Sequence, residues 1–136
     1  MRWPPKASIC RDGEPYLNRY YLLGTGKTLG FFLHHIVASD SHDELHNHPW
    51  PWAVSLVLAG GYDEHRRQGD GTVIKRWIGP GRLNILRASD FHRLELRDQR
   101  PAWTLFFHAR ALTHWGFLDP ITGAFREYIR KPKSSA

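Results

Sequence analysis

The chain has 136 residues, a formal net charge of +6, a hydrophobic fraction of 41% and a single cysteine. This length allows one domain with its own core, predicted to span residues 1–136, and the hydrophobic content argues against extensive disorder. The lone Cys10 excludes a disulfide within the chain and a thiolate zinc cluster.

Taken in chain order, the sequence predicts many short strands separated by turns. Residues 1–15 contain three prolines and are expected to form an irregular lead-in, and residues 131–136 a frayed tail. Turn signals such as Gly60-Gly61 recur at intervals of about 8 to 12 residues, which is typical of a sandwich or barrel. No segment has a helical period, so the predicted fold class is all-β. The expected strands are residues 16–23, 28–37, 53–59, 62–67, 72–78, 82–88, 91–97, 103–111, 115–117 and 124–129.

The pair His46 and His48 is the strongest chemical signal in the sequence. Two residues apart on a strand, their side chains point to one face, about 7 Å apart along the chain. Two imidazoles in this arrangement can reach one metal ion, and imidazole suits Fe, Ni, Cu and Zn. The alternative is a pair of surface histidines in a loop made rigid by Pro49 and Pro51.

The segments after the pair support a metal site. An apolar run at residues 53–59 ends at Gly60-Gly61, and the segment Arg87-Ala88-Ser89-Asp90-Phe91-His92 follows later in the chain. This pattern resembles the cupin superfamily, in which a His-x-His pair precedes an apolar strand ending in Gly and a later turn precedes another His. Arg87 and Ser89 stand where the second cupin motif usually has Pro and Gly.

The resemblance spans roughly residues 28–110 and implies a single cupin-type barrel, also called a double-stranded β-helix or jelly roll. It also implies that His46, His48 and His92 are metal ligands. Segments at residues 46–64, 103–106 and 115–117 are similar to those of small single-domain cupins from bacteria and phages, a group without a settled function.

The glutamate of the first cupin motif has no counterpart here, because it should fall near Ala53 and no carboxylate stands there. Glu64 lies on the next expected strand, shares a face with Tyr62, and is expected to supply the missing ligand. The alternative is that Glu64 is a surface charge beside Arg66-Arg67 that stabilises little. Weaker substitutes in the preceding loop are Asp43 and Glu44.

Tyr62 and His108 are the candidates for acid–base catalysis. His108 shares a strand face with Phe106 and could line the interior. Arg82 and Arg87 are expected near the site, where either could bind a substrate carboxylate or phosphate, although both could equally face solvent.

Other aromatic side chains and histidines could also reach the interior. At most one of the adjacent residues His34 and His35 can face it, because neighbouring side chains on a strand point to opposite faces. Three tryptophans could wall a pocket, and at least two of them are expected to serve packing instead. These are Trp50, Trp52 and Trp103.

Three imidazoles with one carboxylate leave open positions on an octahedral ion, an environment suited to Fe(II) that binds both substrate and dioxygen. Because the resemblance to cupins implies oxygenases as a leading activity, the first hypothesis is a dioxygenase-like Fe(II) enzyme acting on a small anionic molecule. The alternatives are a metal-dependent sugar or sugar-phosphate isomerase or lyase, and a ligand-binding cupin without catalysis. Mn, Ni and Zn are the alternative ions.

The basic residues are scattered without a long Lys/Arg run, which favours a small anionic partner over nucleic acid. No apolar signal core follows the first residues, and no stretch approaches the roughly 18 to 20 apolar residues of a membrane span. We therefore expect a cytoplasmic protein without a membrane partner. A homodimer that exchanges a strand at residues 16–23 would remove an unpaired sheet edge.

Overall fold

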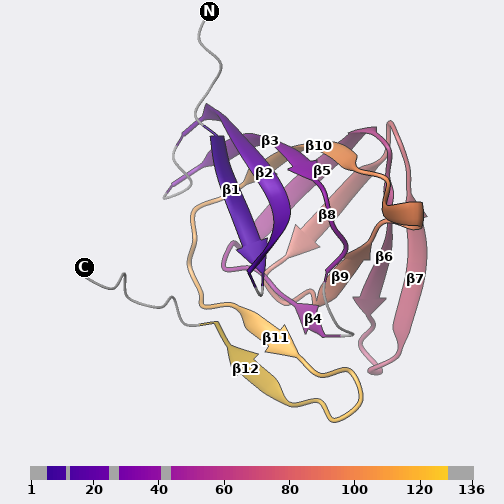
Figure 1. Ribbon diagram of the computed structural model, residues 1–136. Coiled ribbons are helices and arrows are strands. Elements are labelled where there is room, and N and C mark those ends of the chain that lie inside the picture. Colours follow the sequence, from indigo (N-terminus) through magenta and orange to yellow (C-terminus); the bar gives the residue numbers. More distant parts are fainter. Residues whose placement is uncertain (1–5, 12, 25–27, 41–43, 129–136) are drawn as a thin grey trace, which may run out of the picture.

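The chain folds into two six-stranded antiparallel sheets that face one another across a shared interior (Figure 1). The structure, a computed structural model, describes residues 6–11, 13–24, 28–40 and 44–128. From β3 onward the chain passes back and forth between the two sheets, so that each sheet is built from segments distant in sequence. This arrangement is a jelly roll, and it confirms the all-β prediction.

In spatial order, the first sheet contains β1 (Lys6–Arg11), β2 (Glu14–Leu23), β3 (Gly30–Ile36), β10 (Ala102–His108), β5 (Trp52–Ala59) and β8 (Leu83–Arg87). The second sheet contains β12 (Phe125–Glu127), β11 (Gly116–Leu118), β4 (Leu45–His46), β9 (His92–Glu95), β6 (Tyr62–Arg67) and β7 (Val73–Ile78).

The central strands of the first sheet show the alternation that a half-buried strand requires. In β3, Phe32, His34 and Ile36 are buried, and the residues between them are only partly so. In β10 the same holds for Thr104 and Phe106. The two strands pair directly, so their buried side chains form one continuous inner face.

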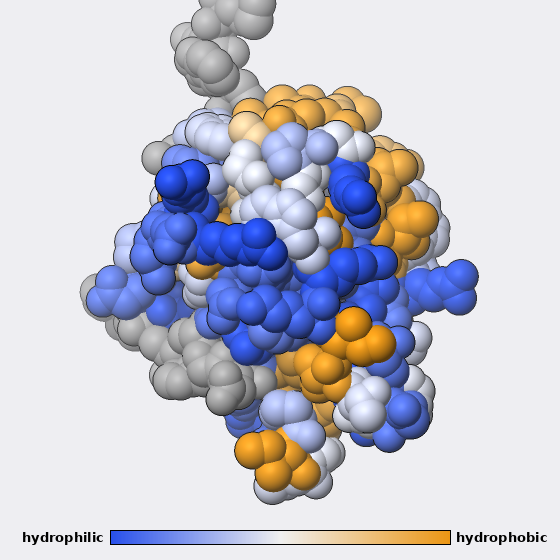
Figure 2. Space-filling model, turned by 90° about the vertical axis from the view of Figure 1, so that its right-hand side faces the viewer, coloured by the Kyte–Doolittle hydropathy of each residue, from blue (hydrophilic) through white to orange (hydrophobic). Residues whose placement is uncertain are grey.

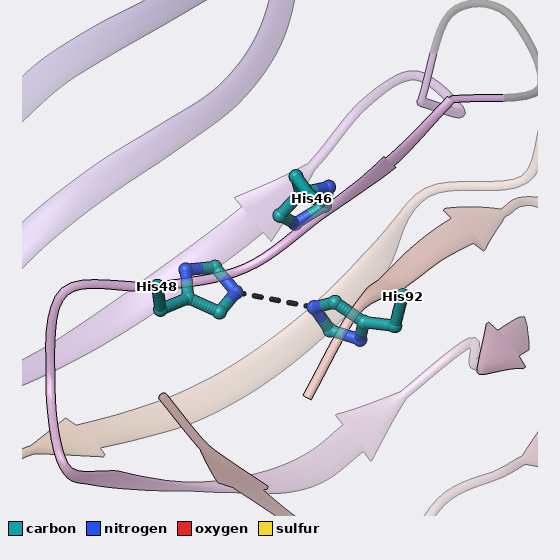
Figure 3. A group of neighbouring side chains, drawn as sticks. All are labelled: His46, His48 and His92. Carbon is teal, nitrogen blue, oxygen red and sulfur yellow. Dashed lines mark hydrogen bonds between the residues drawn. The ribbon is translucent and has the colours of Figure 1, made fainter. Parts of the chain in front are cut away.

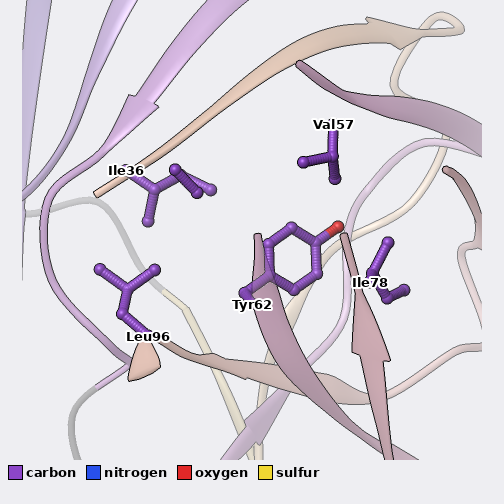
Figure 4. Close-up of a cluster of buried hydrophobic side chains, with 6 residues drawn as sticks. Ile36, Val57, Tyr62, Ile78 and Leu96 are labelled. Atoms are coloured by element: carbon purple, nitrogen blue, oxygen red, sulfur yellow. The ribbon is translucent and has the colours of Figure 1, made fainter. Parts of the chain in front are cut away.

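A core cluster joins the two sheets at one end of the interior (Figure 4). Ile36 and Val57 come from the first sheet, whereas Tyr62 and Ile78 come from the second. Leu96, just after β9, and Ala102 complete the cluster. Burial of these side chains fixes the separation of the sheets and so defines the space left for a site farther along the interior.

The prediction that residues 1–15 form an irregular lead-in is wrong for the residues of this range that the structure describes. Residues 6–11 form β1, and Gly13, with φ of +81°, makes the turn into β2. Pro15 is accommodated because the β1–β2 register shifts beside it, and a bulge tolerates a residue without an N–H group. The tail at residues 131–136 lies outside the described residues.

The strand proposed for exchange in a dimer is paired on both sides within its own sheet. β2 lies between β1 and β3, so residues 16–23 have no unpaired edge in the single chain, and exchange of this strand in a dimer stays a prediction. The strands at the sheet edges are β1, β8, β12 and β7.

The outer face of the second sheet is largely hydrophilic, as the view onto the side carrying β7 shows (Figure 2). Lys75 of β7 and Arg93 of β9 both lie within 4 Å of the Glu95 carboxylate, so part of the positive charge is neutralised locally. Among the described residues the helical element is a single 3-10 turn, Arg97–Gln99, far too short to cross a membrane.

We predict that Val57→Ala lowers the free energy of unfolding by about 1–3 kcal/mol, because it leaves a cavity between the sheets. Val57 is 1% exposed, whereas its neighbour Leu58 is 45% exposed and is the matched control. Leu58→Ala should stay within about 0.5 kcal/mol of the parent in urea denaturation. Equal losses in the two variants would contradict the assignment of Val57 to the core.

Candidate metal centre

Three histidine side chains meet on the inner side of the second sheet (Figure 3). His46 ends β4, His48 follows two residues later, and His92 begins β9. His46 and His92 are direct partners across the β4–β9 pair. One nitrogen from each ring lies within 4.8 Å of the others, and the Nε2 atoms of His48 and His92 are 3.1 Å apart.

The backbone around these histidines is held by the polar residues of the two motifs. Asn47, between the first two histidines, donates from Nδ2 to the Ala88 carbonyl and accepts from the Gly116 amide. Asp90 accepts a hydrogen bond from the Arg87 amide and so closes the turn before His92. The hydrogen bond of the Asp90 side chain therefore stabilises this turn in place of the Pro and Gly that the second cupin motif usually has here.

The electrostatic surroundings keep the first two imidazoles neutral. Burial lowers the pKa of His46 and of His48 well below the usual imidazole value, and the positive charge that His92 can carry lowers both further. Neutral imidazole is the form that binds a metal, because protonation removes the lone pair. The site is thus set to donate nitrogen lone pairs at neutral pH.

The three residues fit a divalent metal ion. Two nitrogens bound at about 2.1 Å and at right angles lie about 3 Å apart, which matches the separation of the His48 and His92 Nε2 atoms. His46 Nδ1 is buried without a hydrogen-bond partner and lies 3.8 Å from the Asp40 carboxylate. A carboxylate behind an imidazole is the usual support of a metal-binding histidine.

The structure places Glu64 behind His92 rather than among the nitrogens that face one another. Its Oε2 lies 2.9 Å from His92 Nδ1, and a carboxylate only accepts, so Nδ1 donates this hydrogen bond and, in the neutral ring, Nε2 carries the lone pair. Of the weaker candidates, Glu44 pairs with Arg126 at 3.1 Å, and Asp43 lies outside the described residues.

Glu64 is a buried carboxylate with three hydrogen-bond donors on the same oxygen. Asn84 Nδ2 donates at 2.6 Å and Arg66 Nη2 at 3.1 Å, in addition to His92. Burial alone would raise the pKa of Glu64, but the hydrogen bonds and the neighbouring positive charge outweigh it and lower the pKa to about 2. Sequence reasoning missed Asn84, because an isolated Asn on a strand carries no motif.

The site lies on the wall of a cavity of about 310 Å³ between the sheets. Tyr62 lines this cavity, and its hydroxyl accepts a hydrogen bond from Asn84 Nδ2 at 3.2 Å. The remaining lining is mainly apolar and includes Ile36, Leu86, Leu94 and Phe106.

Other residues considered from the sequence are divided between the interior and the outer face. His34 lines the cavity, whereas His35 stacks on Trp103 on the other side of β3. Trp50 lines the cavity and stacks on His48, with ring centroids 5.0 Å apart. Trp52 stacks on Phe107 outside, so two of the three tryptophans serve packing, as expected.

His108 is buried but is not part of the cavity lining. It stacks behind Trp50, with centroids 4.2 Å apart, and its Nδ1 lies 2.7 Å from the Ala109 carbonyl oxygen. Gly30 allows this placement, since a Cβ there would lie 2.3 Å from the His108 ring. In this position His108 supports Trp50 from behind.

Several solved structures share this architecture. HppE in its Fe(II) form with the alternative substrate (S)-1-HPP has a TM-score of 0.63 at 14% identity, covering 76% of this chain and 55% of that one. An uncharacterised protein with a double-stranded β-helix domain from Klebsiella pneumoniae has a TM-score of 0.57 at 17% identity, covering 82% and 90%. A Ralstonia eutropha protein provisionally assigned as a mannose-6-phosphate isomerase has a TM-score of 0.59 at 21% identity, covering 73% and 89%.

These similarities show that the chain has the double-stranded β-helix fold of the cupins. The chain spans about half the length of HppE, with 55% of that chain covered. No family model matches the sequence, and no curated protein sequence does. The chain thus combines a cupin fold with three clustered histidines that could hold a metal ion.

We predict that Glu64→Gln weakens metal binding by about 10- to 100-fold, because the neutral amide holds the His92 ring and its proton less firmly. Competition with a chromogenic chelator measures the affinity. The matched control is Glu95→Gln, on the outer face and 40% exposed at its side chain, which should bind metal as the parent does. Unchanged affinity in Glu64→Gln would contradict a role for Glu64 in supporting the site.

We also predict that His46→Leu abolishes metal binding yet stabilises the metal-free protein by about 1 kcal/mol at pH 7, because a buried nitrogen without a partner is removed. The gain should grow as pH falls below about 6.5. Because burial lowers the pKa of His46 in the folded parent, the unfolded parent takes up a proton at a higher pH than the folded parent does. The free energy of unfolding of the parent therefore falls below this pH, whereas the His46→Leu variant has no such loss. Urea denaturation after chelation, between pH 5 and 8, tests both points, and a destabilised variant would contradict them.

Proposed function

We propose that this protein is a metal-dependent oxygenase that holds Fe(II) on His46, His48 and His92 and acts on a small anionic molecule. The observation that carries the proposal is the group of three facing imidazole nitrogens within 4.8 Å on the wall of an interior cavity. A closed structural site would have no adjoining space, whereas a catalytic site keeps open positions toward a substrate.

The ion is proposed from the ligand chemistry. Three neutral imidazoles suit Fe(II), and an ion with open positions supplies a Lewis acid and an electron source for dioxygen. Three similar structures are Fe(II) forms of HppE, which supports iron over the alternatives Mn, Ni and Zn.

The surrounding residues prepare the site for such chemistry. Glu64 fixes the tautomer and the orientation of His92, so that Nε2 faces His48. Trp50 and Phe106, whose ring centroids are 5.4 Å apart, form an apolar wall beside His48 that limits access of water. The cavity is large enough for a small molecule and too small for a polymer.

A metal-dependent isomerase or lyase is the second candidate, and the position of Tyr62 favours it. The hydroxyl lines the cavity, and burial raises the pKa of Tyr62, so the group stays protonated at neutral pH. Tyr62 could therefore act as a general acid toward a bound substrate. His108 does not line the cavity and packs behind Trp50, so it has no direct contact with a molecule bound there.

The first test is metal content by mass spectrometry on protein purified without an affinity tag. We predict about one equivalent of iron per chain in the parent and its loss in His48→Ala and His92→Ala. His114→Ala is the control, because this side chain is 89% exposed. Circular dichroism confirms that each variant is folded.

Oxygen uptake by the iron-loaded protein with candidate small acids then separates the activities. Uptake that is lost in His92→Ala supports the oxygenase. Solvent proton exchange into a sugar phosphate without uptake supports the isomerase. Absence of bound metal after anaerobic reconstitution with Fe(II) would overturn both enzyme proposals and leave the ligand-binding barrel as the remaining hypothesis.

A further inference from the structure

Two arginines reach the cavity from the first sheet, and their surroundings differ. Arg11 on β1 forms an ion pair with the buried carboxylate of Asp40. Its guanidinium also lies over the Tyr16 ring, 4.3 Å from the centroid. The charge of Arg11 is therefore already neutralised within the protein.

Arg19 on β2 has only neutral partners among the described residues. Its Nε donates to His34 Nε2 at 3.0 Å, and its guanidinium lies 4.6 Å from the centroid of Phe32. Burial and the nearby cation lower the pKa of His34 well below its usual value, so His34 is a neutral acceptor. No acidic side chain in the described ranges forms an ion pair with Arg19.

Arg19 is partly buried, and a cation partly withdrawn from water without a counter-ion is unfavourable. Burial accordingly lowers the pKa of Arg19, with Tyr21 offsetting part of the effect. An anion that entered the cavity would remove this cost by pairing with the guanidinium, whose planar fork matches a carboxylate or phosphate.

Arg19 is also connected to the metal centre along one wall of the cavity. His34, which accepts its hydrogen bond, stacks on Phe106 with centroids 4.9 Å apart. Phe106 contacts Trp50, and Trp50 stacks on His48. A molecule lying against these rings would have Arg19 at one end and the histidines at the other.

We propose that Arg19 binds the acidic group of the substrate, a carboxylate or a phosphate, and thereby directs the rest of the molecule along the aromatic wall toward the histidines. The inference rests on the proposed function for what happens at the metal, but anion binding itself needs no metal. It also replaces the arginines expected from the sequence, since Arg82 and Arg87 are exposed and do not line the cavity.

The test is calorimetric titration of the full chain with butyrate and with propyl phosphate, each an acid with a short apolar tail. Butanamide is the uncharged counterpart of butyrate. The titrations are made on the protein as purified and again after chelation. The variants are Arg19→Gln and Arg19→Lys, and Arg82→Gln is the control with the same loss of charge.

We expect at least one of the two acids to bind the parent and the Arg82→Gln variant with equal affinity, whether or not metal is present. Butanamide should bind neither of these two proteins. Arg19→Gln should weaken binding roughly 10- to 100-fold, the range for losing hydrogen bonds to a charged group. Arg19→Lys should restore part of it, because the charge returns without the fork. Whichever acid binds more tightly identifies the acidic group as carboxylate or phosphate.

The proposal is overturned if neither acid binds, if Arg19→Gln binds as the parent does while folded by circular dichroism, or if butanamide binds as well as butyrate. Binding that disappears on chelation would also overturn it, since the metal would then hold the anion. Arg19-dependent binding in protein that never takes up iron would support the inference while the oxygenase proposal failed.

Discussion

The buried carboxylate of Glu64 is the constraint on which the rest of the site depends. It lies on β6 in the second sheet and accepts hydrogen bonds from Asn84 on β8 in the first sheet and from His92 on β9. A buried charge is tolerated only when its hydrogen bonds are satisfied, and here that satisfaction requires the two sheets to keep one spacing. The same bonds set the proton on His92 Nδ1 and turn Nε2 toward His48.

The charged side chains around the cavity beside this network are not paired equally. On one side Glu64 and Asp40 stand behind histidines, and Arg66 and Arg11 respectively neutralise them. On the other side Arg19 has no such partner among the described residues. The interior therefore has the histidine nitrogens at one place and the guanidinium of Arg19 at another. The aromatic wall of Trp50 and Phe106 lies between them. A small acid that contacts a metal with its other end is complementary to that distribution.

Much of the fold could be predicted because turn residues and alternating apolar residues act locally. The segment 62–67 was predicted with the bounds that β6 has, and β10 differs from its expected range by a few residues. The strand at residues 6–11 was missed because nearby prolines indicate a break, and only the register shift beside Pro15 shows how the sheet accommodates one. Two-residue β4 carries no periodicity and exists through its partners β9 and β11.

The sequence by itself determined that the chain is all-β, because turn residues and alternating apolar residues act locally. Its His-x-His spacing and its resemblance to the cupins made His46, His48 and His92 the candidate ligands. Only the tertiary structure decided what Glu64 and Arg19 contact. Hydrogen bonds and ion pairs between strands depend on sheet order and register, and these join residues far apart in sequence, such as Glu64 with Asn84. The same reason placed His108 behind Trp50 and left Arg19 without an acidic partner among the described residues.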